Sequence, residues 1–277
     1  MLSWPGVLLR VAFFAGAVMA GEIVFQSLIL VGFGVVVAST IGLFAVAILA
    51  NLVAIRIFDR QPLSHIGLGG NPGTGRNFLL GVLIGGFGAM LLLLPPLISG
   101  TAHMSARAHG SFRWSSLIFY LACLLFGAAA EEMIFRGYAF QVLVQKMGAF
   151  ATILPVSVLF ALGHFWNPNV SVLGVVNTML WGVLLGYAFV RSRDLWLPIG
   201  MHYGWNAMLP LFGANLSGLT IDVTRYSYKW DLAALWSGGT YGPEGGLLTT
   251  ILVIVLFFTV HRAPVVPQQA FIATNLN

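Results

Sequence analysis

The chain alternates between long apolar runs and short polar segments, and most of the runs are long enough to cross a bilayer. A membrane-spanning helix needs roughly 20 mainly apolar residues. By this measure we predict about eight spans, at about residues 7–20, 28–55, 78–98, 116–145, 151–166, 172–190, 197–212 and 247–260. We therefore expect an all-α fold, a polytopic transmembrane helical bundle that forms a single integral membrane domain over residues 1–277.

Two polar segments between these runs are interpreted as connections. Segment 213–246 mixes charged residues with tyrosine and tryptophan, which is typical of a loop at the membrane interface. The glycine-rich segment 67–75 lacks the lysine and serine or threonine that end a phosphate-binding loop, so we predict a turn there.

The composition agrees with a membrane location. Hydrophobic residues make up 58% of the chain and charged residues 8%, and the mean hydropathy is +0.92. Soluble domains carry about a quarter charged residues, so this chain lacks the polar surface that water would require. Cys123 is the single cysteine, which excludes an intrachain disulfide.

The net charge of +5 does not indicate a nucleic-acid partner, because the 13 basic residues are scattered between apolar runs. Lysine and arginine gather in cytoplasmic loops, and their distribution favours cytoplasmic location of both termini. With the N-terminus inside, the inner basic residues are Arg56, Arg60, Arg76, Lys146, Arg191, Arg193 and Arg262, and the outer ones are Arg107, Arg113, Arg225 and Lys229.

Three ionisable residues interrupt the fourth apolar run. Glu132 and Arg136 are four residues apart, so they share a helix face and can form an ion pair. Glu131 is rotated by about 100° from Glu132 and is free to meet another helix. A charge at the bilayer centre costs roughly 3 kcal/mol on insertion scales, and such residues usually face a cavity or a partner. A structural ion pair at a helix end would explain Glu132 and Arg136, but not the second glutamate.

Two further runs carry polar residues. The fifth run contains His164, four residues after Phe160, and the seventh contains His202 and Asn206, which are four residues apart. His164 alone, or His202 with Asn206 alone, is explained by hydrogen bonding between packed helices. Two carboxylates, two histidines and an amide on three spans are harder to explain that way, because burial of each polar group costs free energy. We predict that they converge on one site.

These residues resemble a known family, the type II CAAX prenyl endopeptidases, also called the CPBP intramembrane protease or CAAX protease self-immunity family. The resemblance covers about residues 117–211 and includes the lead-in Leu195-Trp196-Leu197-Pro198-Ile199. It rests on three motifs in the order Glu131-Glu132-x-x-x-Arg136, Phe160-x-x-x-His164 and His202-x-x-x-Asn206.

The resemblance implies an intramembrane endopeptidase whose catalytic core occupies about residues 115–212. Glu131 would act as general base on a water that it holds with His164. His202 and Asn206 would donate hydrogen bonds to the oxyanion. In supporting positions, Glu132 and Arg136 would keep the helix in register, and Phe160 would pack beside His164.

A metal-dependent variant of this site is an alternative. Glu131, His164 and His202 are acceptable zinc ligands, and zinc with an open position activates water. However, the chain has no His-Glu-x-x-His motif, and Asn206 beside His202 suits an oxyanion better than zinc. We therefore favour a mechanism with no cofactor.

The short loops resemble those of bacterial members of the family, so we expect the protein in a bacterial inner membrane. The expected partners are the lipid bilayer and a membrane-associated peptide or protein substrate, of which a prenylated CAAX protein is one form. Two other functions stay open: a proton-coupled transporter and a non-catalytic membrane scaffold or immunity protein. Proteolysis requires Glu131, His164, His202 and Asn206 to converge, transport favours a chain of sites, and scaffolding requires neither.

Overall fold

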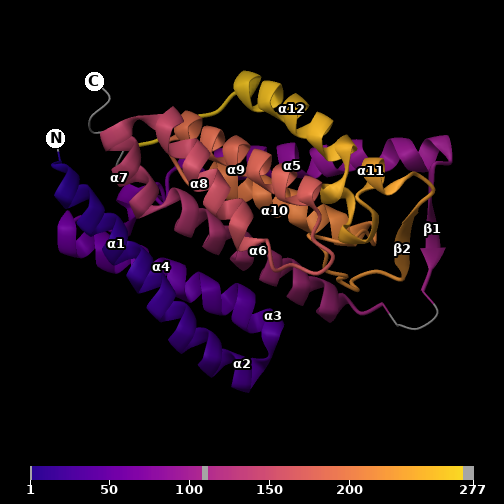
Figure 1. Ribbon diagram of the computed structural model, residues 1–277, viewed down its shortest axis with the longest axis horizontal. Coiled ribbons are helices and arrows are strands. Elements are labelled where there is room, and N and C mark those ends of the chain that lie inside the picture. The colour runs from indigo at the N-terminus through magenta and orange to yellow at the C-terminus, as the bar shows by residue number, and fades with distance from the viewer. Residues whose placement is uncertain (1, 108–111, 271–277) are drawn as a thin grey trace.

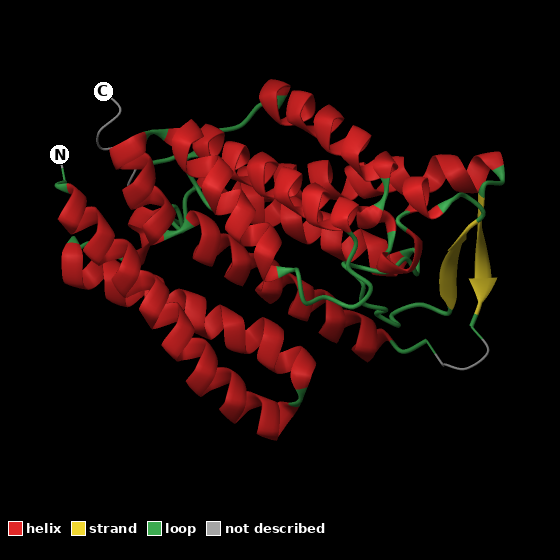
Figure 2. Cartoon of the chain, viewed as in Figure 1, coloured by secondary structure: helices red, strands yellow, loops and turns green. Residues whose placement is uncertain are grey.

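Helices form most of the chain in the computed structural model, which describes residues 2–107 and 112–270. One two-stranded sheet lies at one end of the helical bundle (Figure 2). The all-α class predicted from the apolar runs is therefore confirmed. The longer helices are α1 (Trp4–Gly21), α4 (Leu43–Phe58), α5 (Pro72–Ser99), α6 (Trp114–Arg136), α7 (Tyr138–Met147), α8 (Ala149–Gly163), α9 (Val172–Ser192), α10 (Trp196–Leu211) and α12 (Leu247–Arg262).

Several described helices are long and apolar enough to cross a membrane. The five that meet both criteria are Trp4–Phe25, Val35–Phe58, Pro72–Ser99, Trp114–Met147 and Val172–Ser192. Ala149–Gly163 and Leu247–Arg262 are apolar but shorter. The structure thus confirms a polytopic helical membrane protein, whereas the predicted count of about eight spans is not confirmed.

The N-terminal part forms a hairpin that projects from the bundle (Figure 1). Its first arm continues from α1 through a π-helical turn, η1 (Glu22–Gln26), into α2 (Ser27–Phe33). The chain reverses at Gly34, whose φ of 82° is costly for other residues. It then returns through α3 (Val35–Val37) and η2 (Ala38–Gly42) to α4. The predicted start of the second span at residue 28 is therefore wrong, because residues 28–33 belong to the first arm.

The predicted fourth span is broken into α6 and α7 at Gly137. A Cβ atom at this position would lie 2.1 Å from the carbonyl oxygen of Met133, so only glycine fits without a shift. The buried Asn51 of α4 binds both backbone groups at the break: its Nδ2 donates to Met133 O, and its Oδ1 accepts from Tyr138 N. Gln141 donates to Arg136 O on the same side. These bonds fix the end of α6, which carries the glutamates.

α5 and α10 pack with their backbones in contact. Glycines occur every fourth residue on each helix, at Gly81 and Gly85 of α5 and at Gly200 and Gly204 of α10. A Cβ atom at Gly85 would lie 2.0 Å from Met201 O, and one at Gly204 would lie 2.4 Å from Val82 O. Small residues at this spacing let membrane helices approach closely. The contact fixes α10, which carries His202 and Asn206.

The start of α10 is anchored by a buried carboxyl group. Asp194 accepts hydrogen bonds from Asn77 Nδ2 of α5 and from Leu197 N of α10. Asn77 also bonds both backbone groups of Val266, in the segment after α12. Burial raises the pKa of Asp194, and these hydrogen bonds oppose that rise. Asn77 thus joins α5, the start of α10 and the C-terminal segment.

The sheet is an antiparallel ribbon of β1 (Ala102–Ala106) and β2 (Tyr226–Trp230). In its register Ala102 pairs with Trp230 and Ala106 with Tyr226. The ribbon is pinned to α5 by Tyr228, whose hydroxyl donates to Leu93 O. Burial raises the pKa of Tyr228, which keeps this donor protonated. Segment 213–246 was predicted as a loop, and the structure places β2 inside it.

Short helical elements form the rest of the end that carries the ribbon, and one lies in the connection before α5. Several glycines in or beside these elements have a positive φ. These elements are η3 (Leu63–Ile66), α11 (Ala234–Ser237), η4 (Gly239–Tyr241) and η5 (Pro243–Gly245).

Candidate active site

A buried ion pair lies at the end of α6. Arg136 Nη1 lies 3.1 Å from Glu132 Oε1, and the two side chains are 1% and 0% exposed. Arg136 Nη2 donates to Gly182 O of α9 at 2.8 Å, and the guanidinium lies 4.8 Å from the centre of the Phe160 ring of α8. The ion pair expected from the spacing is therefore present. It joins three helices rather than bracing α6 alone.

His202 of α10 contacts the same carboxylate. Its Nδ1 lies 2.9 Å from Glu132 Oε1, the oxygen that also accepts from Arg136. An ionised carboxylate only accepts hydrogen bonds, so the network assigns a proton to Nδ1 of His202. Glu132 thus orients the His202 ring and directs its Nε2 away from the ion pair.

His164 is oriented by its own helix. α8 ends at Gly163, and His164 follows as the C-cap residue with ψ near 0°. Its Nδ1 lies 2.9 Å from Phe160 O, a carbonyl that can only accept, so Nδ1 donates. The Phe160 ring is 4.8 Å from the His164 ring and 6.1 Å from the His202 ring. Phe160 is therefore the apolar wall between the two histidines.

Glu131 faces both histidines. Its Oε2 lies 3.8 Å from Nε2 of His164 and 3.8 Å from Nε2 of His202. These distances are too long for direct hydrogen bonds, and Oε2 has no hydrogen-bond partner among the described residues. The Glu131 side chain is 26% exposed, whereas Glu132 beside it is fully buried. Residues from three helices thus converge on one carboxylate oxygen.

Asn206 lies one helical turn beyond His202 on α10 and is half-buried. Its side chain makes no hydrogen bond to a described residue, Glu131 included. The turn that carries it is held by the preceding residue: Trp205 Nε1 donates to Glu244 Oε1 at 3.0 Å. The other oxygen of Glu244 accepts from the backbone and hydroxyl groups of Ser217.

Sequence reasoning missed four residues that support this site. Asn51 and Gln141 had a signal, because each is a polar residue inside an apolar run. Gly182 had none, because it contributes only a backbone oxygen. Glu244 lies outside the three motifs, in a segment that we assigned to the interface.

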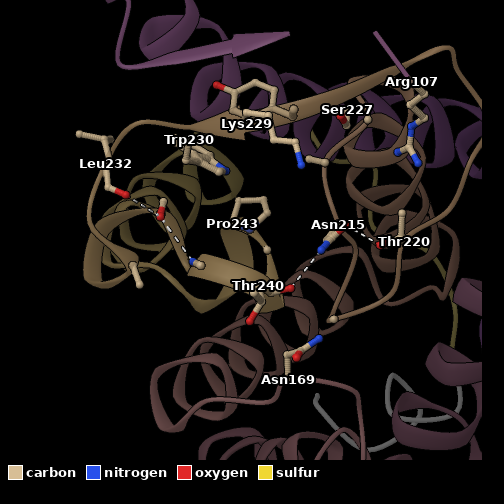
Figure 3. Close-up of a pocket in the computed structure, with 18 residues that line it drawn as sticks. Arg107, Asn169, Asn215, Thr220, Ser227, Lys229, Trp230, Leu232, Thr240 and Pro243 are labelled. Atoms are coloured by element: carbon tan, nitrogen blue, oxygen red, sulfur yellow. Dashed lines mark hydrogen bonds between the residues drawn. The ribbon is translucent and has the colours of Figure 1, made fainter. Parts of the chain in front are cut away.

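The two described cavities lie away from this site. Within residues 2–107 and 112–270, no group of three histidine, cysteine, aspartate or glutamate residues is arranged to hold a metal ion. Two described cavities, of about 600 and 460 Å³, lie elsewhere and are not lined by Glu131, His164 or His202. The larger lies beside the ribbon (Figure 3).

Comparison with known proteins identifies the segment that carries these residues. Residues 112–208 match the family model described as "Type II CAAX prenyl endopeptidase Rce1-like". No curated protein and no solved structure matched the chain. The match contains all three motifs from which the resemblance was inferred. The chain is thus an integral membrane protein, and its segment 112–208 is similar to the Rce1-like type II CAAX prenyl endopeptidases.

Proposed function

We propose that the protein is a glutamate-dependent intramembrane endopeptidase that hydrolyses a peptide bond in a membrane-associated substrate. The observation that carries the proposal is the convergence of His164 Nε2 and His202 Nε2 on Glu131 Oε2, at 3.8 Å each. A polar contact of this length is too long for a direct hydrogen bond, and a water that bonds to these atoms is the group that we place beside them. The catalytic core proposed from the sequence, residues 115–212, contains every residue that is given a role in the mechanism below.

The tautomers assign complementary roles around that water. Because His164 Nδ1 donates to Phe160 O, a neutral His164 ring presents an acceptor at Nε2. An ionised Glu131 is also an acceptor. A water between them would donate one hydrogen to each, which leaves its lone pairs for the scissile carbonyl. As the oxygen–carbon bond forms, Glu131 takes a proton from the water, and later gives it to the leaving amine.

The oxyanion would be bound from α10. Because His202 Nδ1 already donates to Glu132, its Nε2 can donate only from the doubly protonated ring. The positive charge of that ring and of Arg136 would balance the two glutamates. Asn206 Nδ2, which has no partner among the described residues, would be the second donor. Oxyanion-hole donors of this kind are each worth about 10²–10³ in rate.

The metal-dependent alternative stays open to test. Nε2 of each histidine and Oε2 of Glu131 are zinc-ligand atoms, and each Nδ1 is held by an acceptor, as is usual for zinc-bound histidine. We propose the mechanism without a metal, because Asn206 beside His202 suits an oxyanion better than zinc, and we assign no step to a metal.

The test is peptide cleavage by the purified full chain in liposomes, with farnesylated CAAX peptides and membrane-anchored peptides as substrates. Wild type is compared with Glu131→Gln, which removes the base and keeps the shape. We expect the cleavage rate to fall by about 10²–10⁴-fold in this variant. Cleavage by the wild-type protein should persist in a strong chelator. The control variant Asp231→Asn, at the exposed ribbon end, should cleave as wild type.

Two results would contradict the proposal. Cleavage by Glu131→Gln at the rate of wild type would remove Glu131 as base. Loss of activity in chelator with recovery on added zinc would replace the proposed mechanism with the metal-dependent one.

A further inference from the structure

The cavity beside the ribbon has a charged and polar lining with no acidic residue. Its volume is about 600 Å³, and none of the residues that line it is an aspartate or glutamate. Two lining residues are cationic: Arg107, directly after β1, and Lys229 of β2. Figure 3 shows Lys229 on one side of this cavity and Asn169 on the opposite side. A ligand here would meet positive charge that no lining carboxylate neutralises.

Several hydrogen-bond donors in this lining have no partner among the described residues. The side chains of Lys229, Trp230 and Asn169 make no hydrogen bond or ion pair to a described residue. Arg107 is partly used: it donates to Tyr226 O and pairs with Asp222, which lies outside the lining. Unpaired donors that surround one cavity fit an oxyanion, because an oxyanion accepts several hydrogen bonds at once.

The walls of the cavity are held by bonds that do not depend on a ligand. Asn215 Nδ2 donates to Thr240 O at 3.0 Å, and Thr220 Oγ1 donates to Asn215 Oδ1 at 2.9 Å. Gly218 N donates to Tyr241 O at 2.8 Å. The loop after α10 and the loop before α12 are thus fastened together. Binding sites for small ligands are usually preformed in this way.

The position of the cavity indicates where its ligand comes from. α5 is a candidate membrane span that ends at Ser99, three residues before β1, so the ribbon lies at the end of a span. Trp114, Tyr226 and Trp236 are exposed at this end, and exposed tryptophan and tyrosine are typical of the membrane–water interface. Lipid phosphate groups lie at the same depth, and basic side chains attract anionic lipids there.

We infer that this cavity binds the phosphate group of an anionic lipid headgroup, with Lys229 as the main charged contact and Asn169 on the facing wall. The site is separate from the Glu131 cluster and does not depend on proteolysis. The same chemistry would bind free phosphate, so the experiment has to distinguish the two sources.

Binding can be measured by native mass spectrometry of the full chain in a non-ionic detergent, titrated with phosphatidylglycerol, glycerol 3-phosphate or inorganic phosphate. Lys229→Gln should weaken phosphatidylglycerol binding by about tenfold, the effect of one charge-assisted hydrogen bond. Arg225→Gln is the matched control: it removes one positive charge from the same exposed segment, but Arg225 does not line the cavity. It should change binding by less than about twofold, as expected for a screened surface charge.

Each outcome decides a point. Tighter binding of phosphatidylglycerol than of both soluble phosphates, lost in Lys229→Gln, supports a lipid ligand. Equal binding of all three, again lost in Lys229→Gln, supports a phosphate site supplied from solution. Equal weakening of lipid binding by Lys229→Gln and Arg225→Gln would overturn the inference, because binding would then depend on the general surface charge and not on the cavity. Binding of an acidic peptide with none of the phosphates would overturn it as well.

Discussion

Two ionic clusters lie within the helical bundle, and they differ in how completely their carboxylates are bonded. One joins α1, the end of α4 and α7. Asp59 Oδ1 accepts from Arg10 at 2.6 Å, Asp59 Oδ2 accepts from the Tyr138 hydroxyl at 2.5 Å, and that hydroxyl also accepts from Arg10. Both oxygens of its one carboxylate are therefore used inside the protein.

The other cluster contains Glu131, Glu132, Arg136 and His202, and two of its carboxylate oxygens have no partner among the described residues. These are Oε2 of Glu131 and Oε2 of Glu132. Buried polar atoms are almost always hydrogen-bonded, so an unpaired one calls for an explanation. A cluster whose bonds are complete holds helices together. A cluster with acceptors left over can also bind a water or a substrate.

The largest expected effect is on stability, from Glu132→Ala. This change leaves Arg136 buried without its counter-charge and His202 Nδ1 without its acceptor. Breaking a buried pair in this way costs about 3–5 kcal/mol, which thermal unfolding in detergent would detect. The double variant with Glu132→Leu and Arg136→Met should regain most of the stability and remain inactive. A single variant as stable as wild type would show that the ion pair does not hold the three helices.

Asn206→Ala should lower the cleavage rate and leave the stability nearly unchanged. Because its side chain has no hydrogen bond to a described residue, the free energy of unfolding should change by less than about 0.5 kcal/mol. If Asn206 donates to the oxyanion, kcat should fall by about 10²–10³-fold with little change in KM. Unchanged kcat would leave His202 as the only oxyanion donor from α10.

Tyr138→Phe tests the fully bonded cluster. It removes one hydroxyl from the bonds with Asp59 and Arg10, and should lower the free energy of unfolding by about 1–2 kcal/mol. The cleavage rate should stay within about twofold of wild type, because this cluster leaves no acceptor for a water. A rate loss as large as that of Asn206→Ala would erase the distinction between the two clusters.

The smallest effect is expected at Asp194, a buried carboxyl group outside the spans. Burial raises its pKa, so the folded state binds its proton more tightly than the unfolded state. The contribution of Asp194 to stability should therefore fall as pH rises from about 4, its unfolded pKa, through the raised value. Asp194→Asn should lack that fall when unfolding midpoints are compared across this pH range. Parallel pH profiles of the two proteins would contradict the prediction.

The sequence predicted the parts of the structure that depend on one helix at a time. Apolar runs located most helices, and the spacing of four residues gave the pair Glu132–Arg136 and the shared face of His202 and Asn206. The resemblance inferred from the three motifs covers nearly the same segment that the family model matches. The role of each site residue and the choice between metal-free and metal-dependent chemistry stay predictions.

Contacts between segments distant in sequence were not predictable. The reversal at Gly34 and the break at Gly137 occur inside runs that we predicted as single spans, because mean hydropathy does not register a change of direction. The contact of His202 with Glu132 spans 70 residues and depends on how α10 packs against α6. β2 was missed because its pairing with β1 joins two polar segments that flank different helices.

The glycine contact between α5 and α10 has a mechanical consequence. With backbone against backbone, no flexible side chains separate these helices, so neither can slide or tilt without a clash with the other. They act as one rigid body, and His202 and Asn206 are fixed to it. If the proposed function holds, a motion that opens the site would move α6 or α8 against this pair, and would change the distances from Glu131 and His164 to α10. Closure around a substrate and assembly of the catalytic residues would then be the same movement.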